Sequence, residues 1–310
     1  MNPLDTLSIL RHNARKSEYR HTLKETVFWR GRGVHSGEEV EVCASPHHPM
    51  RRESLGVIIN GFPLSTWRLH HRLMSTGLIH ESGLEIRMTE HLFAALSCSG
   101  IDDVKIEIRS KSKREDVAPL EFPILDGSAG QYIEPLIPML TSFSPDDERE
   151  LRTPIIIQQP LSCTLGQSEV HLLPNLGQRY ASTPLCAIEF ELDQPPIPQQ
   201  TVSISGDRIE LDHLVNARTF GLLRDEEPLR GMNLIRGVTY DNTTVFDDQG
   251  IALNSLGTAD DPARHKILDL IGDLYCLGRP LDAVIHVHKG GHALNHLLIE
   301  SLQSLDESVS

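Results

Sequence analysis

The chain has 310 residues, which at about 150 residues per domain suggests two domains. Hydrophobic residues make up 39% of it and charged residues 23%, which excludes a disordered polymer and a membrane bundle. Acidic residues outnumber basic ones by 43 to 29, and the net charge of -14 argues against a general binder of nucleic acid or anionic membranes.

Nothing in the sequence indicates membrane insertion or export. No apolar stretch approaches the ~20 residues that span a bilayer, and the N-terminus lacks the apolar core of a signal peptide. The five cysteines include no pair at CxxC spacing, which fits a reducing cytoplasm better than a disulfide framework or a thiolate zinc site. We therefore expect a cytoplasmic protein, and its unusual feature is its 16 histidines.

The first half predicts a mixture of strands and helices. Alternating apolar and polar residues around Val40 and around Ile106 predict half-buried strands. Between them, residues 89–97 predict a short helix with Thr89 as a candidate N-cap and a stop at Gly100. Residues 122–130 predict a turn that leads into a second helix.

The second half repeats this theme. Residues 155–157 and 188–192 predict strands, and prolines end the second of these. Residues 261–277 predict the clearest helix of the chain, and a strand at 283–288 follows. Both halves contain a helix, a glycine stop, an aspartate and a strand, so we expect two similar α+β halves joined by a polar linker at 141–151.

The helix predicted at 261–277 carries a candidate metal site. His265 and Asp269 are four residues apart, so their side chains share one helix face and can converge on one ion. Asp273 lies one turn further and is a candidate to orient an imidazole by hydrogen bond. The alternative is a surface helix with an ordinary His–Asp pair.

Glu90 and His91 form a second candidate pair. Adjacent residues on a helix point about 100° apart, so the two cannot chelate one ion together. They can divide the work, with His91 as a metal ligand and Glu90 as a base. The alternative is a glutamate that stabilises the start of a helix, beside a half-buried histidine.

Two further segments have candidate roles. Gly290 and Gly291 let the backbone bend close to a ligand and present His292 at a strand-to-helix corner. Thr219 supplies a hydroxyl just before an aromatic residue and a glycine. A helix-capping loop and a simple strand edge are the respective alternatives.

Together these residues form a coherent set for hydrolysis. Catalytic zinc takes three protein ligands, a set that His91, His265 and Asp269 can provide. Glu90 is then the candidate base, His292 the candidate acid, and Thr219 a donor to the developing oxyanion. The set predicts metal-assisted amide or ester hydrolysis.

Six motifs in order give the chain a family resemblance. The motifs are Gly33–Gly37, Thr89–Leu96, Pro123–Ala129, Ala217–Gly221 with Arg224 and Asp225, Arg264–Asp273, and Gly291–Asn295. In these motifs the chain resembles the zinc-dependent UDP-3-O-acyl-N-acetylglucosamine deacetylases of lipid A biosynthesis. The resemblance runs from about residue 22 to about residue 298.

The resemblance implies a fold and an activity. The fold would be α+β, with two similar domains of sheet and helix packed as a β-α-α-β sandwich that has the helices in the middle. A polar arm would occupy residues 1–20. The two domains would be 21–140 and 152–310, with the linker between them. The activity would be hydrolysis of the 2-acetamido group of a UDP-linked, acylated glucosamine in a Gram-negative type of bacterium, which would release acetate.

The resemblance also implies a role for each site residue. The metal ligands would be His91, His265 and Asp269, and the base Glu90; Thr219 would stabilise the oxyanion, and His292, steadied by Asp273, would be the acid. Phe220, Lys266, Lys289 and Gly291 would line the sugar–diphosphate path. An apolar passage for the acyl chain would lie in 222–247, the ligand helix at 261–277 and the acid loop at 289–295.

The chain departs from the family pattern at two substrate positions. Leu192 stands where the family tends to carry an aromatic residue that packs on uracil, and Ser168 stands near the position of a frequent basic residue. These departures keep two alternatives open: a zinc amidase of the same fold acting on another acylated sugar, and a non-catalytic nucleotide-sugar binding protein. We expect a monomer that binds Zn²⁺ or, in vivo, Fe²⁺, with no nucleic-acid partner.

Overall fold

The computed structural model describes residues 20–48, 55–72, 74–111, 119–142, 154–175, 187–204, 208–254 and 257–309. Of the polar arm expected at 1–20, only Arg20 lies in these ranges. Of the linker expected at 141–151, only residues 141 and 142 do. No described helix combines the length and the apolar character that a membrane-spanning segment needs.

The first half of the chain forms two sheets and two helices. One sheet has the order β2 (Val27–Arg32), β3 (Glu39–Pro46), β9 (Asp103–Ser110), β4 (Gly56–Ile59) and β5 (Phe62–Pro63). The other has the order β10 (Leu120–Glu121), β8 (Glu85–Arg87), β7 (Ser75–His80) and β6 (Trp67–Arg72). The helices are α2 (Glu90–Ser99) and α3 (Gly130–Leu136). The strands predicted around Val40 and Ile106 are confirmed as β3 and β9, which pair antiparallel.

The second half builds one five-stranded sheet with helices on one side. Its strand order is β13 (Leu161–Leu165), β14 (Ser168–Leu173), β20 (Val284–His288), β15 (Ala187–Leu192) and β16 (Gln200–Ile204). Strands β15 and β20 run parallel, and the other neighbours are antiparallel. The helices are α4 (Arg208–Val215), α6 (Asp261–Leu274) and α7 (His292–Val309). The strands predicted at 188–192 and 283–288 are confirmed as β15 and β20.

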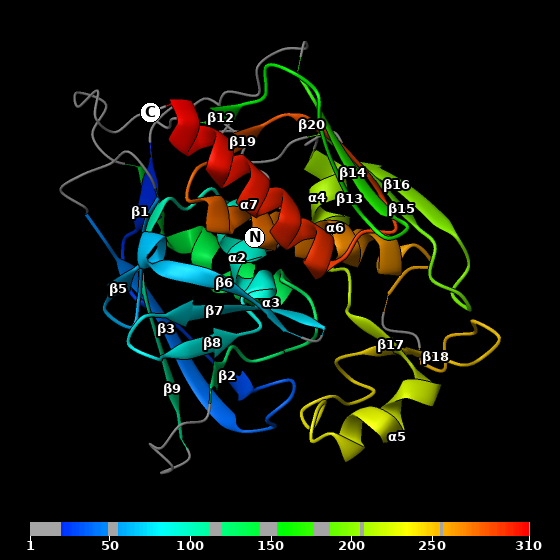
Figure 1. Ribbon diagram of the computed structural model, residues 1–310. Helices are drawn as coiled ribbons and strands as arrows, with labels where there is room; N and C mark the ends of the chain where they lie inside the picture. The colour runs from blue at the N-terminus through cyan, green and yellow to red at the C-terminus, as the bar shows by residue number, and fades with distance from the viewer. Residues whose placement is uncertain are drawn as a thin grey trace.

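Short elements complete the described chain. Two-stranded sheets join β1 (His21–Leu23) to β11 (Leu140–Ser142) and β12 (Ile155–Ile156) to β19 (Leu281–Asp282). Single 3-10 turns are η1 (Leu64–Thr66), η2 (Ile137–Met139) and η4 (Tyr275–Leu277). A small lobe, drawn in yellow in Figure 1, contains β17 (Phe220–Leu222), α5 (Leu223–Gly231) and β18 (Thr244–Phe246).

Helices fill the space between the sheets of the two halves. In Figure 1, α2 and α6 lie between the first-half sheets and the second-half sheet, with α7 beside them. Every residue of α2 is buried, and so are most residues of α6. The predicted α+β class with helices in the middle is therefore confirmed. We keep the boundaries 21–140 and 152–310 as a proposal, which the position of the sheets of each half on opposite sides of these helices supports.

The contact between α2 and α6 depends on a glycine. A Cβ at Gly272 of α6 would lie 2.0 Å from the carbonyl oxygen of Glu90 at the start of α2. No larger residue fits there without a shift of one helix, because a non-bonded carbon and oxygen do not approach so closely. Gly272 thus lets the two helices bring their functional side chains together.

The helix ends match the sequence prediction except at one cap. Helix α2 ends at Gly100, whose φ of 72° is left-handed, and α6 passes through η4 to Gly278 at φ 70°. Thr89 occupies the N-cap position of α2, but its side chain makes no capping hydrogen bond. The predicted N-cap residue is therefore confirmed, but its hydroxyl donates to the carbonyl of Thr76 on β7, 3.4 Å away, and does not cap the helix.

Candidate metal centre

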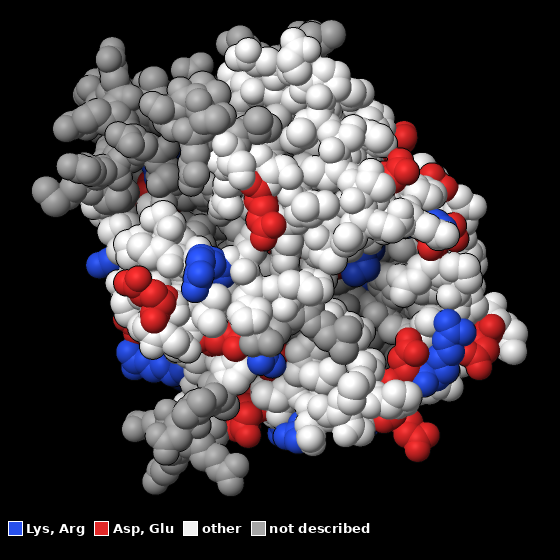
Figure 2. Space-filling view, in the orientation of Figure 1, with Lys and Arg blue, Asp and Glu red and all other residues white. Residues whose placement is uncertain are grey.

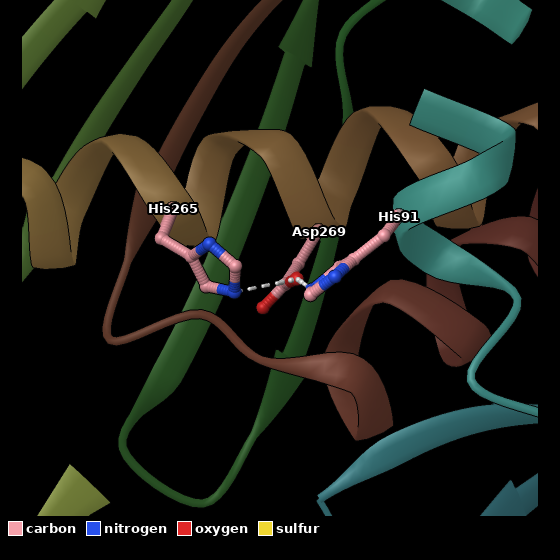
Figure 3. Close-up of side chains that lie close together, drawn as sticks. All are labelled: His91, His265 and Asp269. Atoms are coloured by element: carbon pink, nitrogen blue, oxygen red, sulfur yellow. Dashed lines mark ion pairs between the residues drawn. The ribbon is translucent and has the colours of Figure 1, made fainter. Parts of the chain in front are cut away.

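Helices α2 and α6 bring three potential metal ligands together. His265 and Asp269 lie one turn apart on α6, and His91 lies in the first turn of α2. Figure 3 shows the three side chains pointing toward one another. They are 2%, 2% and 4% exposed respectively, so solvent does not screen them. All ligand atoms of the group lie within 4.8 Å of one another.

Asp269 stands between the two imidazoles. Its Oδ1 lies 3.4 Å from Nε2 of His265 and 3.8 Å from Nε2 of His91. The two rings are nearly perpendicular, with centroids 5.0 Å apart. Oδ2 of Asp269 accepts a hydrogen bond from Nζ of Lys266 at 2.9 Å. One oxygen therefore faces both imidazole nitrogens while the other is held by a cation.

The protonation states suit metal binding. Nδ1 of His265 lies 3.1 Å from the carbonyl oxygen of Ala217, an acceptor only, so Nδ1 carries the proton and Nε2 keeps a lone pair. Burial lowers the pKa of His265 and lowers that of His91 to about 3, so both rings are neutral at pH 7. Burial acts to raise the pKa of Asp269, but Lys266 and the histidines hold it well below its usual range.

Glu90 lies beside this group and carries a raised pKa. It is 1% exposed, and its Oε2 accepts a hydrogen bond from the backbone N–H of Thr76 at 3.2 Å. Burial, with the neighbouring Asp269 and Asp273, raises the pKa of Glu90 to about 8. A carboxyl group with a pKa near the working pH can both take and release a proton.

His292 lies opposite Glu90 at the start of α7. Its Nε2 is 4.0 Å from Oε1 of Glu90 and 3.7 Å from Oδ2 of Asp269. Its Nδ1 is 2.8 Å from Oδ2 of Asp273. Burial acts to lower the pKa of His292, but the surrounding carboxylates, Asp273 foremost, raise it to about 9. The ring is therefore protonated at neutral pH.

Two further residues hold Asp273 and a third contacts one of these two, and sequence reasoning did not assign them this part. The hydroxyl of Thr76 donates to Oδ1 of Asp273 at 2.6 Å, and Nδ2 of Asn295 donates to Oδ2 at 2.8 Å. Nε2 of His296 lies 2.8 Å from the same hydroxyl. Asn295 lies one turn after His292, a spacing that the sequence contains. Thr76 comes from strand β7, and no local pattern links it to α6 or α7.

Thr219 and Phe220 lie at the edge of the group. The backbone N–H of Thr219 donates to the carbonyl of Gly127. Thr219 lies two residues after Ala217, whose carbonyl oxygen contacts Nδ1 of His265. The Phe220 ring lies 6.4 Å from the His265 ring and 5.5 Å from Nζ of Lys266. The structure therefore places Phe220 beside the metal ligands, and Thr219 precedes it in the chain. A cavity of about 650 Å³ has Phe220 in its wall, together with Arg218, Phe246 and the start of α6.

Three predicted substrate residues lie outside this cluster. Nζ of Lys289 forms an ion pair with Asp193 at 2.8 Å, at the end of β20. Gly291 follows it in the loop before α7, with open space where a Cβ would point. Leu192 is 2% exposed and packs in the core, because the alternation of β15 turns it inward. Its contact with a uracil ring stays a prediction that this burial does not favour.

The small lobe carries exposed apolar side chains. Leu222 and Ile235 are buried, whereas Leu223 is 41% and Met232 is 56% exposed. Figure 2 shows acidic and basic side chains scattered over one face of the molecule, without a continuous basic area. In this lobe, exposed apolar side chains therefore stand beside the charged residues of α5.

Comparison with known proteins identifies the family. Residues 20–304 match the family described as UDP-3-O-acyl N-acetylglycosamine deacetylase. Proteins named UDP-3-O-acyl-N-acetylglucosamine deacetylase from Idiomarina loihiensis and Myxococcus xanthus are each 33% identical, over 91% and 94% of this chain and 88% of their own lengths. The one from Photobacterium profundum is 34% identical over 93% of this chain and 91% of its own. The chain therefore belongs to the UDP-3-O-acyl-N-acetylglucosamine deacetylase family.

Proposed function

We propose that this chain hydrolyses the 2-acetamido group of UDP-3-O-acyl-N-acetylglucosamine and releases acetate, the committed step of lipid A biosynthesis. The observation that carries the proposal is the buried group of His91, His265 and Asp269, with Glu90 and His292 beside it. Membership of the deacetylase family over residues 20–304 supports the substrate.

The donor set fits a zinc ion. Two neutral imidazoles, each with Nε2 facing Asp269, and one ionised carboxylate are the nitrogen and oxygen ligands that Zn²⁺ takes in catalytic sites. When bound, Zn²⁺ lowers the pKa of water and polarises a carbonyl group. Fe²⁺ suits similar ligands, so the ion used in vivo is a matter for metal analysis.

Glu90 and His292 divide the proton transfers. Ionised Glu90 takes a proton from the attacking water, since its buried carboxylate is a stronger base than an exposed one. Protonated His292 then donates a proton to the departing amine, while Asp273 holds its Nδ1–H and keeps Nε2 toward the site. The two groups face each other across 4.0 Å, so the substrate amide would lie beside both.

The remaining site residues are assigned to substrate binding. Thr219 would donate a hydrogen bond to the oxyanion, since it lies two residues after Ala217, whose carbonyl oxygen contacts His265. The sugar–diphosphate path would be lined by Phe220, Lys266, Lys289 and Gly291. The burial of Leu192 does not favour its contact with the uracil ring. The exposed apolar residues of the lobe at 222–247 support its assignment to the acyl chain. Because one chain supplies every catalytic group, we propose that it works as a monomer, in the cytoplasm of a Gram-negative type of bacterium.

The direct test is acetate release from the UDP-sugar by the enzyme with one equivalent of metal. Chelation should abolish turnover and added Zn²⁺ should restore it; full activity in a metal-free preparation contradicts the proposal. Glu90→Gln should keep the metal but lower turnover by about 10²–10⁴-fold. If wild type and Glu90→Gln are equally inert, a non-catalytic binding protein is favoured. Equal turnover of a substrate without uridine favours a zinc amidase for another acylated sugar.

A further inference from the structure

The outer face of the second-half sheet carries three neighbouring histidines. His286 and His288 are separated by one residue on β20, so their side chains point to the same face of the sheet. His171 on the adjacent antiparallel strand β14 stands directly opposite His286. The side chains of His171, His286 and His288 are 47%, 42% and 40% exposed. All three therefore face solvent, on the side of the sheet away from α6.

Carboxylates already hold two of these imidazoles by one nitrogen. On the parallel neighbour β15, Glu189 stands opposite His286 and Glu191 opposite His288. Nδ1 of His286 lies 3.3 Å from Oε1 of Glu189, and Nδ1 of His288 lies 3.0 Å from Oε2 of Glu191. Both contacts use Nδ1, so Nε2 of each ring faces outward for another partner. A histidine that binds metal through one nitrogen usually gives the other to a carboxylate in this way.

We propose that His171, His286 and His288 bind a divalent cation of the Zn²⁺ class on this face, with Glu189 and Glu191 orienting two of the rings. Residues directly opposite on neighbouring strands have Cβ atoms about 4.5–5.5 Å apart, within reach of a shared ion for two imidazoles. Three imidazoles form an established zinc ligand set, with water in the fourth position. Imidazole nitrogen also favours Zn²⁺ over Mg²⁺ or Ca²⁺, which prefer oxygen.

The rings have to turn to complete the site, because the three histidines are not among the described residues whose ligand atoms already lie within 4.8 Å of one another. His171 now contacts Oγ of Ser162 through Nδ1 at 2.8 Å and Oε2 of Glu169 through Nε2 at 3.3 Å. These are exposed contacts, and exposed contacts of this kind contribute little to stability. Rotation of the His171 ring toward His286 therefore costs little against the metal–nitrogen bond that His171 would gain.

The site is separate from the catalytic centre. The catalytic ligands lie on helices α2 and α6 and are almost fully buried, whereas these histidines lie on strands and are about half exposed. An ion on the sheet would brace β14 against β20, the strand that leads into the loop before His292. It would add stability without entering the chemistry.

The test is a metal count on the enzyme that already holds one equivalent of zinc. Equilibrium dialysis against Zn²⁺, followed by metal analysis, should give two equivalents for wild type and one for His286→Ser and for His288→Ser. His213→Ser, which removes a lone exposed histidine on α4, is the matched control and should keep two. A single equivalent in wild type, or two in His286→Ser, overturns the proposal.

Two more variants separate this site from the catalytic one. Glu189→Gln should weaken binding of the second zinc equivalent about 10–100-fold, because it removes the negative charge of the group that contacts Nδ1 of His286. His265→Ala should lose the catalytic equivalent and keep the sheet equivalent. Loss of both equivalents in His265→Ala would mean that no independent site exists on the sheet.

Discussion

Nδ1 of His292 lies 2.8 Å from Oδ2 of Asp273, and this contact sets the charge of the imidazole. Asp273 is fully buried and heads the groups that raise the pKa of His292 to about 9. Asp273→Asn keeps the shape of the side chain and removes its charge. The pKa of His292 should then fall toward its ordinary value of about 6.5.

The loss of activity in Asp273→Asn should grow with pH. At pH 8 an imidazole of ordinary pKa is about 3% protonated, so we expect kcat/KM to fall about 30-fold there and much less at pH 6. The measurement is the pH dependence of kcat/KM, with Asp248→Asn as an exposed control that should match wild type. An equal loss at both pH values would show that Asp273 does not act through the His292 charge.

The wild-type rate should follow a bell-shaped pH profile. Activity should rise with pH as Glu90, whose pKa burial raises to about 8, loses its proton, and fall as His292, with a pKa near 9, loses its own. A bound divalent cation shifts both limbs to lower pH because positive charge favours loss of a proton. A kcat/KM profile that is flat from pH 5 to 9 would contradict the assignment of base and acid.

Local patterns predicted much of the fold and part of the site. The four-residue spacing of His265 and Asp269, with apolar residues between them, predicted a buried helix with both side chains on one face, as α6 shows. The same periodicity could not tell which helix faces α6. His91 was joined to that site by its residue type and by family resemblance, since the meeting of α2 and α6 is a tertiary contact.

Other site features left no local signal. Thr76 donates hydrogen bonds to both Asp273 and Glu90, yet no local sequence pattern links its strand to α6 or α7. The role of Leu192 stays a prediction, because a buried strand position and a ligand-facing one look alike in an alternating sequence. The domain linker at 141–151 falls almost wholly outside the described residues, so that boundary stays a prediction.

Gly272→Ala should separate the metal ligands. The added methyl group would meet the Glu90 carbonyl at 2.0 Å, so α6 must move away from α2, taking His265 and Asp269 away from His91. We expect a loss of about 1–3 kcal/mol in unfolding free energy, as for other overpacked cores, together with weaker zinc binding. Denaturant unfolding and zinc titration measure the two effects.

A matched glycine makes the Gly272 result specific. Gly231 ends α5 and has open space where a Cβ would point, so Gly231→Ala should leave zinc affinity unchanged. Wild-type zinc affinity in Gly272→Ala would show that the helix contact does not position the ligands.

Thr76→Val tests whether one hydroxyl supports the acid. The change is nearly isosteric, keeps the backbone N–H that binds Glu90, and removes the donor to Oδ1 of Asp273. It also leaves the buried Nε2 of His296 without its partner, so unfolding free energy should fall by about 1–3 kcal/mol. Zinc content should stay at one equivalent, because no metal ligand contacts the hydroxyl, while kcat falls.

Thr76→Ser separates the hydroxyl from the methyl group. Serine restores the donor to Asp273 and removes only packing, so we expect kcat close to wild type with a small loss of stability. If kcat falls equally in Thr76→Ser and Thr76→Val, packing on β7 rather than the hydrogen bond supports the acid. If kcat falls only in Thr76→Val and its basic limb shifts in pH, the hydroxyl supports the charge of His292. It can do so through Asp273, or directly, since the hydroxyl lies 3.1 Å from Nδ1 of His292.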